Sequence, residues 1–179
     1  MTADAIEVRA LGAAEAVEAV PALARVLVDC VENGASVSFM APFTQAEGEA
    51  FFARVAEDVA AGQAILVVAF RDGEIVGTVQ AQFARQPNQP HRFDIAKMLV
   101  HSKARNRGVG AALLAVAERA AAATGRTVGV LDTVTGSVAD RLYARAGWVR
   151  VGEIPDYALW PRGGLCATTF FYKRVGSAA

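Results

Sequence analysis

Hydrophobic residues recur every three or four positions in the first third of the chain, which is the spacing of amphipathic helices. Residues 13–32 follow this spacing and predict one helix, in which Pro21 predicts a kink or a late start. A second helix is expected over about residues 44–61, because Thr44 and Glu47 form a capping-box pattern. Residues 34–43 between them are expected to form a loop. The apolar positions of the first helix are Val17, Val20, Leu23, Leu27 and Val31.

Shorter runs of β-branched, aromatic and alternating residues predict strands. Two of them, 64–70 and 74–84, flank Asp72-Gly73, a dipeptide typical of tight hairpins. Helices over 108–124 and 137–146 separate the later strands. Strands joined first by a hairpin and then through helices predict an α/β fold with a mixed sheet flanked by helices. The remaining strands are expected at 6–11, 93–100, 127–131, 148–151 and 166–172.

Composition narrows the class of protein. The 179 residues are expected to form a single domain spanning 1–179, and 54% hydrophobic with 20% charged residues excludes a disordered chain. The 18 basic and 18 acidic residues cancel, which argues against broad binding to nucleic acid or to an anionic membrane. Neither a signal peptide nor an apolar stretch of membrane-spanning length is expected, so we predict a cytoplasmic protein. Cys30 and Cys166 form no disulfide framework and no metal-ligand spacing.

A glycine-containing turn carries the most specific chemistry. It follows the strand predicted at 93–100 and opens the helix predicted at 108–124, with Gly108 and Gly110 one residue apart. Such glycines let backbone amides approach a ligand, and the positive end of the helix suits a phosphate. The turn is not a Walker loop, and Leu113 stands where a dinucleotide-binding turn would carry its third glycine. On this pattern alone, a turn whose glycines serve only backbone geometry is an equal alternative.

Two motifs resemble the GNAT family of N-acetyltransferases. Arg105-Asn106-Arg107-Gly108-Val109-Gly110 is similar to the family's acetyl-CoA pyrophosphate loop, and Tyr143 with Gly147-Trp148 is similar to its Tyr-x-x-x-Gly-aromatic segment. Further segments resemble the tabtoxin-resistance acetyltransferase branch of the family. A departure from many members is Gly136, which replaces an asparagine that contacts the pantetheine arm. The segments similar to that branch are 34–40, 96–100, 131–133, 136–139, Tyr157 and 171–173.

The resemblance implies the GNAT fold, a mixed, mostly antiparallel and splayed sheet flanked by helices, with acetyl-CoA as cosubstrate. The amides of the glycine turn would hold the pyrophosphate, and the preceding strand would run beside the pantetheine arm. The amide near Met98 or Leu99, freed by a strand bulge, would donate to the carbonyl oxygen of the thioester. The expected acetyl-CoA contacts are Met98, Leu99, Val100, Arg105, Asn106, Arg107, Gly108, Val109, Gly110 and Ala111.

Three side chains are expected to be catalytic. Tyr143 keeps its phenol proton at neutral pH and is the acid that the resemblance implies for the departing thiolate, although its ring is also expected to pack against the sheet. Asp94 alternates with Ala96, Met98 and Val100, and Asp132 lies similarly on the next strand. Two carboxylates on neighbouring strands would raise each other's pKa and attract a cationic amine, whereas a lone one would more simply cap a strand end. The branch carries the longer Glu at Asp94, so whether either aspartate acts directly or through water stays open, with Asp132 favoured.

The acceptor pocket is expected between two loops. Ser36, Phe39 and Met40 occupy the loop between the first helices, and Tyr157 occupies the loop predicted between the last strands. Packing of these loops explains the same residues equally well. Cys166 has no neighbouring base or cation in the sequence, so an acyl-cysteine intermediate is not expected.

The predicted reaction is direct transfer of acetyl from acetyl-CoA to a primary amine in a ternary complex. The expected acceptor is a small cationic or zwitterionic molecule, and the branch resemblance implies detoxification of a tabtoxin-like β-lactam amino acid. Two alternatives stay open: acetylation of a protein or peptide amine, and a non-catalytic acyl-CoA-binding regulator. A homodimer is compatible with the sequence, which specifies neither a metal nor an oligomeric state.

Overall fold

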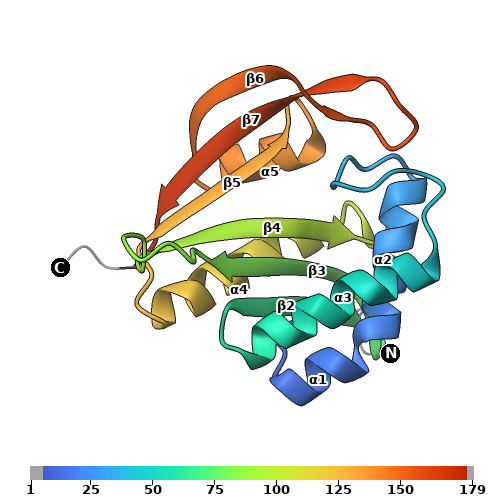
Figure 1. The fold of residues 1–179 in the computed structure, drawn as a ribbon, viewed down its shortest axis with the longest axis horizontal. Coiled ribbons are helices and arrows are strands. Elements are labelled where there is room, and N and C mark those ends of the chain that lie inside the picture. Colours follow the sequence, from blue (N-terminus) through green and yellow to red (C-terminus); the bar gives the residue numbers. More distant parts are fainter. Residues whose placement is uncertain (1–5, 177–179) are drawn as a thin grey trace.

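A single sheet organises the molecule (Figure 1). The computed structural model describes residues 6–176, and within them seven strands follow the order β1-β2-β3-β4-β5-β7-β6. Neighbouring strands are antiparallel except β4 and β5, which are parallel, so the expected mixed and mostly antiparallel α/β sheet is confirmed. The strands are β1 Glu7–Ala10, β2 Ala64–Arg71, β3 Glu74–Phe83, β4 Arg92–Val100, β5 Val128–Val134, β6 Val149–Leu159 and β7 Leu165–Arg174.

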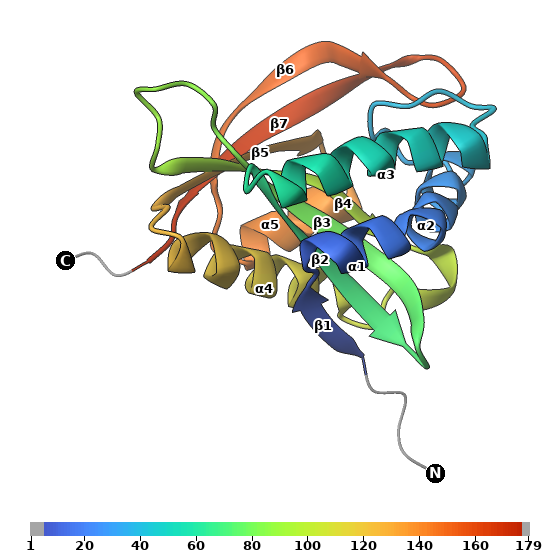
Figure 2. The same cartoon turned by 60° about the horizontal axis from the view of Figure 1, so that its bottom comes forward.

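Helices cover both faces of the sheet (Figures 1 and 2). One face packs against α1, α2 and α3, and the opposite face packs against α4 and α5. Strand β2 serves both cores because alternate residues, such as Leu66 and Val67, point to opposite sides. Within residues 6–176, no helix is both long and apolar enough to cross a bilayer. The helices are α1 Ala13–Glu18, α2 Val20–Glu32, α3 Gln45–Ala60, η1 Ser102–Ala104, α4 Val109–Ala123 and α5 Val138–Arg145.

The first predicted helix is in fact two. The chain leaves the helical course of α1 at Ala19, and Pro21 lies in the first turn of α2, where the missing N–H costs no helical hydrogen bond. Val17 on α1 was expected on the apolar face, but it does not face the core and is 62% exposed. The capping box of α3 is confirmed, since Glu47 N donates to Thr44 Oγ1 over 3.2 Å and Thr44 N donates to Glu47 Oε2 over 2.8 Å.

The last hairpin is longer than the sequence pattern predicts. Strand β6 continues to Leu159, through Pro155, because a register irregularity between Ile154 and Ala158 accommodates the proline at the edge of the sheet. Tyr157 therefore lies in a strand and not in a loop. The loop expected between the strands at 148–151 and 166–172 shrinks to a tight turn between Leu159 and Leu165.

The sheet opens between its two parallel strands. The register of β4 and β5 runs from Arg92 beside Val128 to Asp94 beside Val130 and ends there. Beyond that point β4 stays with β3, and β5 stays with β7, as Figure 1 shows. The predicted divergence of the central strands is thus present, and it places the second half of each strand at the border of a gap in the sheet.

Candidate active site

A bulge in β4 decides which side chains reach each side of the gap. Thr78 pairs with Leu99 and Gln80 pairs with Ala96, so Lys97 and Met98 together oppose one residue of β3. Lys97 adopts a left-handed φ of 50°, which is rare for a residue with a side chain. The extra residue shifts the alternation of the strand by one. The bulge expected near Met98 and Leu99 is therefore present.

The bulge also corrects one prediction about faces. Asp94 and Ala96 pair with Gln82 and Gln80, on the side of the sheet that α2 and α3 cover. Met98 and Val100 were expected on that side, but they pack against the core on the α4 side. A strict alternation from Asp94 onward fails because it cannot include the additional residue.

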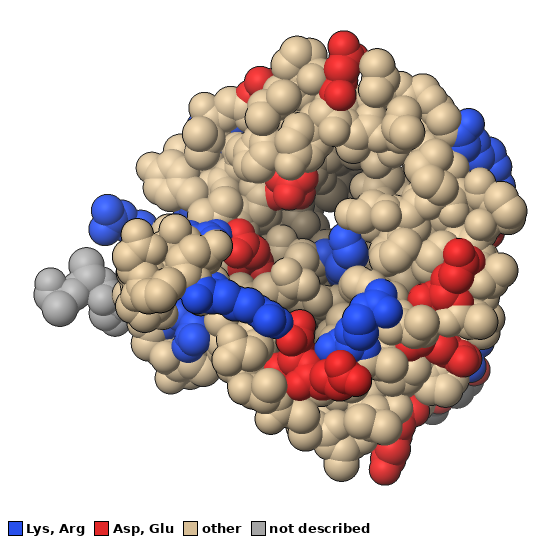
Figure 3. Space-filling model, viewed as in Figure 1, with Lys and Arg blue, Asp and Glu red and all other residues tan. Residues whose placement is uncertain are grey.

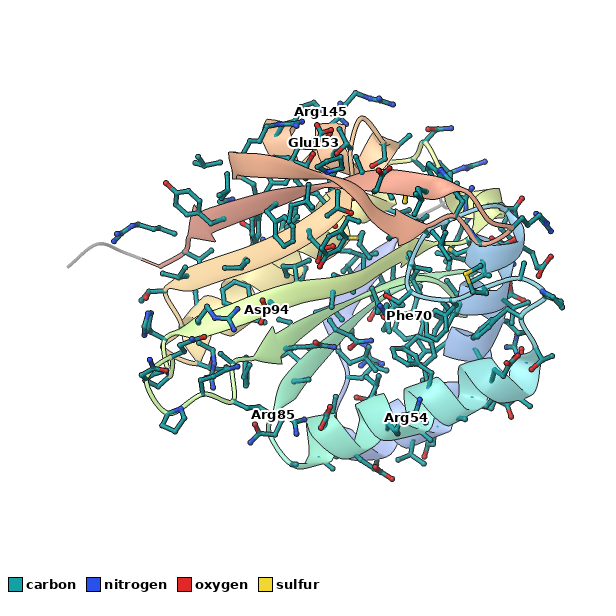
Figure 4. All side chains as sticks on the ribbon, turned by 45° about the horizontal axis from the view of Figure 1, so that its top comes forward. Arg54, Phe70, Arg85, Asp94, Arg145 and Glu153 are labelled. Carbon is teal, nitrogen blue, oxygen red and sulfur yellow. The ribbon has the colours of Figure 1, made fainter. Side chains whose placement is uncertain are left out.

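Four charged side chains gather on the α2–α3 side of the gap, which we call the acceptor face: Arg92, Asp94, Lys97 and Asp132. Arg92 Nη1 and Asp94 Oδ1 form an ion pair of 2.6 Å, with the Asp94 side chain 38% exposed. Asp94 lies near the start of β4 (Figure 4), and Figure 3 shows this side of the molecule hollowed, with acidic and basic side chains along the hollow. Asp132 continues the row from β5, two residues after the partner of Asp94.

The environment of Asp132 suits a proton acceptor. Burial raises the pKa of its carboxyl above the ordinary value, the positive charge of Lys97 opposes this rise, and the negative charge of Asp94 adds to it. The expected influence of one aspartate on the other is thus present for Asp132. A carboxyl whose pKa is raised is a stronger base at neutral pH than an ordinary one.

Lys97 is a site residue that the sequence reasoning missed. Its Nζ donates a hydrogen bond of 2.9 Å to Ser38 Oγ and lies 5.6 Å from the centre of the Phe39 ring. Burial lowers the pKa of the ammonium, and the charge of Asp132 opposes this. A lysine in the middle of an apolar strand is the signal that could have identified it, but the direction of its side chain depends on the bulge.

Tyr143 lies on the opposite side of the sheet, in the core that α4 and α5 cover. It lies on α5, is 4% exposed, and packs with ring centroids 6.1 Å from both Trp148 and Phe171. Burial raises the pKa of the phenol, and the negative charge of Asp132 raises it further, so the proton stays on oxygen at neutral pH. The carboxylate of Asp132 thus acts on the phenol although the two residues lie on different faces of the sheet.

The glycine turn forms the N-terminus of α4 on the same side as Tyr143. Asn106 and Gly108 have left-handed φ values of 60° and 77°, and a bond of 3.1 Å from Ala112 N to Gly108 O begins the helix. A Cβ on Gly108 would meet nothing within 4 Å, so the surface over the turn is open to a ligand. At Gly110 a Cβ would lie 3.2 Å from Leu142, so this glycine lets α4 approach α5 closely.

Side chains hold this turn from behind. Asp29 on α2 accepts hydrogen bonds of 2.7 Å from both the backbone N and the Oγ of Ser102. Arg105 was expected to contact acetyl-CoA, and in the structure its Nε donates to the Val100 carbonyl over 3.1 Å. His101 accepts from Lys103 N, as a capping histidine does. These contacts fix the turn against the end of β4.

The β6–β7 hairpin closes one end of the acceptor face. Ser36 Oγ donates to the Leu159 carbonyl over 2.8 Å, Ala41 N donates to the Pro161 carbonyl over 2.8 Å, and Arg162 pairs with Glu32 over 2.8 Å. Ser36 therefore joins the helical loop to the hairpin. Met40 is exposed beside this junction, where a separate cavity of about 470 Å³ is lined by Glu32, Met40, Ala41, Pro42, Pro161, Arg162 and Gly163.

Aromatic residues form the other wall of the acceptor face. Phe170 is the β7 partner of Asp132 and shares its side of the sheet. The Tyr157 ring lies 5.5 Å from it at 90°. Phe39 lies across the gap with Lys97. Of the expected acceptor residues, the structure thus brings Phe39 and Tyr157 to the charged cluster, holds Ser36 in the junction, and leaves Met40 outside.

Comparison with known proteins decides the family. The model of the acetyltransferase (GNAT) family matches residues 30–148, about two thirds of the chain. The chain belongs to the GNAT family. It is therefore an acetyl-CoA-dependent N-acetyltransferase, and the non-catalytic alternative has no support in these matches.

Solved GNAT structures share the fold over almost the whole chain. An N-acetyltransferase from Staphylococcus aureus Mu50 is 18% identical, with a TM-score of 0.79 over 96% of this chain and 99% of that one. A ribosomal-protein-alanine N-acetyltransferase from Brucella melitensis is 23% identical, with a TM-score of 0.77 over 94% and 99%. A Salmonella typhimurium protein assigned as an acetyltransferase and solved with its cofactor acetyl-CoA is 16% identical, with a TM-score of 0.79 over 98% and 96%.

The residues on the α4 side fit acetyl-CoA. The turn before α4 offers backbone amides at the positive end of a 15-residue helix, with open space above Gly108. Asp132 lies on β5 at the border of the gap, and the bulge at Lys97 interrupts the ladder of β4 with β3. A diphosphate at the turn and an extended arm along β4 match this arrangement of donors.

Proposed function

We propose that the protein transfers acetyl from acetyl-CoA directly to a primary amine of a small cationic or zwitterionic molecule, with both substrates bound together. Acetyl-CoA supplies the thioester carbonyl that an amine attacks. The observation that carries the proposal is Asp132, a carboxylate with a raised pKa at the gap, on the face opposite Tyr143.

Asp132 is the proposed base. Asp132 Oδ accepts one proton from the ammonium form of the acceptor, which frees the nitrogen lone pair to bond to the carbonyl carbon. The second proton that the nitrogen loses as the amide forms balances the one that the departing sulfur gains. Asp94, neutralised by Arg92 at 2.6 Å, contributes negative charge and is not the favoured base. Its short side chain serves the amine through water in this proposal.

Tyr143 is the proposed acid. When the carbon–sulfur bond breaks, Tyr143 Oη donates its proton or a hydrogen bond to the departing sulfur. Its raised pKa supports a donor role, because the phenol is fully protonated at neutral pH. The backbone amides of Met98 and Leu99, beside the bulge, are the proposed donors to the carbonyl oxygen. The amides from Arg105 through Ala111 are the proposed pyrophosphate site.

The closed end of the acceptor face favours a small acceptor. The Brucella relative is named for an alanine of a ribosomal protein, so a protein N-terminus is the alternative acceptor. An extended peptide needs a groove open at both ends, whereas Ser36, Ala41 and Arg162 tie the loop to the hairpin across one end. The resemblance of residues 34–40 and 96–100 to tabtoxin-resistance acetyltransferases favours detoxification of an amino-acid toxin as the biological role.

The proposal is tested by thiol release from acetyl-CoA with a panel of primary amines. Asp132→Asn is expected to lower kcat by about 10²- to 10⁴-fold, the usual contribution of a general base, with Tyr143→Phe also lowering kcat. Glu153→Gln is the control, because this exposed acid lies on β6 away from Asp94 (Figure 4). Turnover that is insensitive to Asp132→Asn and Tyr143→Phe together would remove the assignment.

A further inference from the structure

The charges of the acceptor face are arranged in one closed pair and one open pair. Arg92 and Asp94 contact each other at 2.6 Å. Lys97 on β4 and Asp132 on β5 both lie on the acceptor face at the border of the gap, yet no ion pair joins them in the part of the chain that the structure describes. An ammonium and a carboxylate thus face the same hollow with space between them.

The position of Lys97 is held by three independent features. The left-handed backbone of the bulge sets the start of the side chain, Phe39 lies 5.6 Å from the ammonium, and Ser38 accepts one hydrogen bond from it over 2.9 Å. An ammonium has three N–H donors. Two donors remain for a ligand, and the side chain that carries them is already ordered.

Opposite charges that are partly buried without contacting each other lose hydration and gain little attraction in return. A ligand that carries both charges supplies a counter-ion to both side chains at once, since its carboxylate faces Lys97 and its ammonium faces Asp132. A simple amine would satisfy only Asp132 and would leave the Lys97 ammonium without a counter-ion.

We propose that the acceptor is an amino acid and that Lys97 binds its carboxylate while Asp132 receives its ammonium. This inference rests on the proposed function, because Asp132 then both binds the acceptor and takes its proton. The carboxylate is held on the β4 side of the gap, so the amine nitrogen is directed towards β5. Lys97 is in this view a specificity residue, which selects amines that carry a carboxylate.

The test compares acceptors that differ only by the carboxylate. Rates of thiol release are measured with L-leucine against isoamylamine and with L-lysine against cadaverine. The wild-type protein is expected to prefer the amino acid of each pair. Lys97→Met should lower kcat/KM for the amino acids about 10- to 100-fold, mainly through KM, which is the range expected for the loss of a hydrogen bond between charged groups. It should also abolish the preference for the amino acid over the amine. Lys97→Glu should reverse it in favour of cadaverine.

Two variants serve as controls. Lys97→Arg keeps the charge and is expected to retain the preference, which separates recognition from a folding defect. Arg119→Met removes a positive charge from the exposed surface of α4 and should leave the preference unchanged. An equal loss for both members of a pair in Lys97→Met would mean that Lys97 acts only through Asp132, and it would overturn the inference.

The failure of this inference is distinguishable from that of the proposed function. Turnover of amines without any preference for a carboxylate would overturn the role of Lys97 and leave acetyl transfer to small amines intact. Absence of turnover with every small amine would remove the proposed function. Calorimetric titration of L-lysine into protein saturated with CoA then decides the inference, because it predicts binding that Lys97→Met weakens, and no binding to the wild-type protein contradicts it.

Discussion

Gly129 is a position at which even a single methyl group should lower the free energy of unfolding strongly. It lies on β5 beside Phe93, within the short paired segment from which β4 and β5 diverge. A Cβ added to it would lie 2.7 Å from Phe93 Cζ and 2.8 Å from Trp148 Cη2. Carbon atoms prefer separations of about 3.5–4.0 Å, so each ring would have to retreat by roughly 1 Å.

Neither ring has room to retreat. Phe93 is fully buried, and Trp148 Nε1 is anchored by a hydrogen bond of 2.7 Å to Glu118 Oε1. Overpacking of a dense core costs about 1–3 kcal/mol, and two simultaneous clashes place Gly129→Ala at about 2–3 kcal/mol of unfolding free energy. For a chain of this length, that loss corresponds to a fall in Tm of about 4–12 °C.

The assay is thermal unfolding of Gly129→Ala beside Gly152→Ala. Gly152 also lies in a strand, but a Cβ there would meet nothing within 4 Å, so this variant should unfold within about 0.5 kcal/mol of the wild-type protein. Adding Phe93→Leu to Gly129→Ala shortens one clashing ring, and the double variant should lose less than the sum of the two single losses. Equal Tm values for the two glycine variants would refute the reasoning.

Two further predictions concern charge and the glycine turn. The folded state raises the pKa of Asp132 and so binds its proton more tightly than the unfolded chain does. The stability contributed by the protonated form is therefore lost as pH rises through the folded pKa. In thermal unfolding, Asp132→Asn should be more stable than the wild-type protein at pH 8 but not at pH 3. Gly108→Trp should weaken CoA binding at least about 10-fold in calorimetric titration, because the indole covers the amides that suit a phosphate. The control is Gly125→Trp, which has a left-handed φ of 85° and equally open space at the other end of α4 and should bind CoA like the wild-type protein. A Gly108→Trp protein that binds CoA normally would contradict the placement of the pyrophosphate.

Local sequence signals account for most of the elements. Asp72-Gly73 predicts its hairpin and Thr44 its capping box, because both depend on residues within four positions of each other. The break at Ala19 is less visible, since only Pro21 announces it and the hydrophobic spacing continues across it. The extension of β6 through Pro155 is missed because a proline is tolerated only where the other side of the strand has no partner.

The site is predictable only in part for a similar reason. Asp132 and Tyr143 stand out through their own strand and motif. Lys97 does not stand out in the sequence, because its hydrogen-bond partner Ser38 lies 59 positions away. The direction of its side chain also depends on a left-handed φ at a residue that is not a glycine. No local pattern predicts that conformation, since tertiary pairing with β3 over-determines it.

The additional residue in β4 gives the strand two phases. Before the bulge the odd-numbered Phe93 and Ile95 face the α4 side, and after it the even-numbered Met98 and Val100 do. Straightening the bulge while keeping every residue would turn Leu99, now packed among α2 and α3, to the side of α4 and would turn Met98 the other way. Removing one residue at the bulge would instead keep Leu99 beside Thr78 and lose the left-handed residue, so the number of residues between Asp94 and Leu99 decides which side chains reach each face of the sheet.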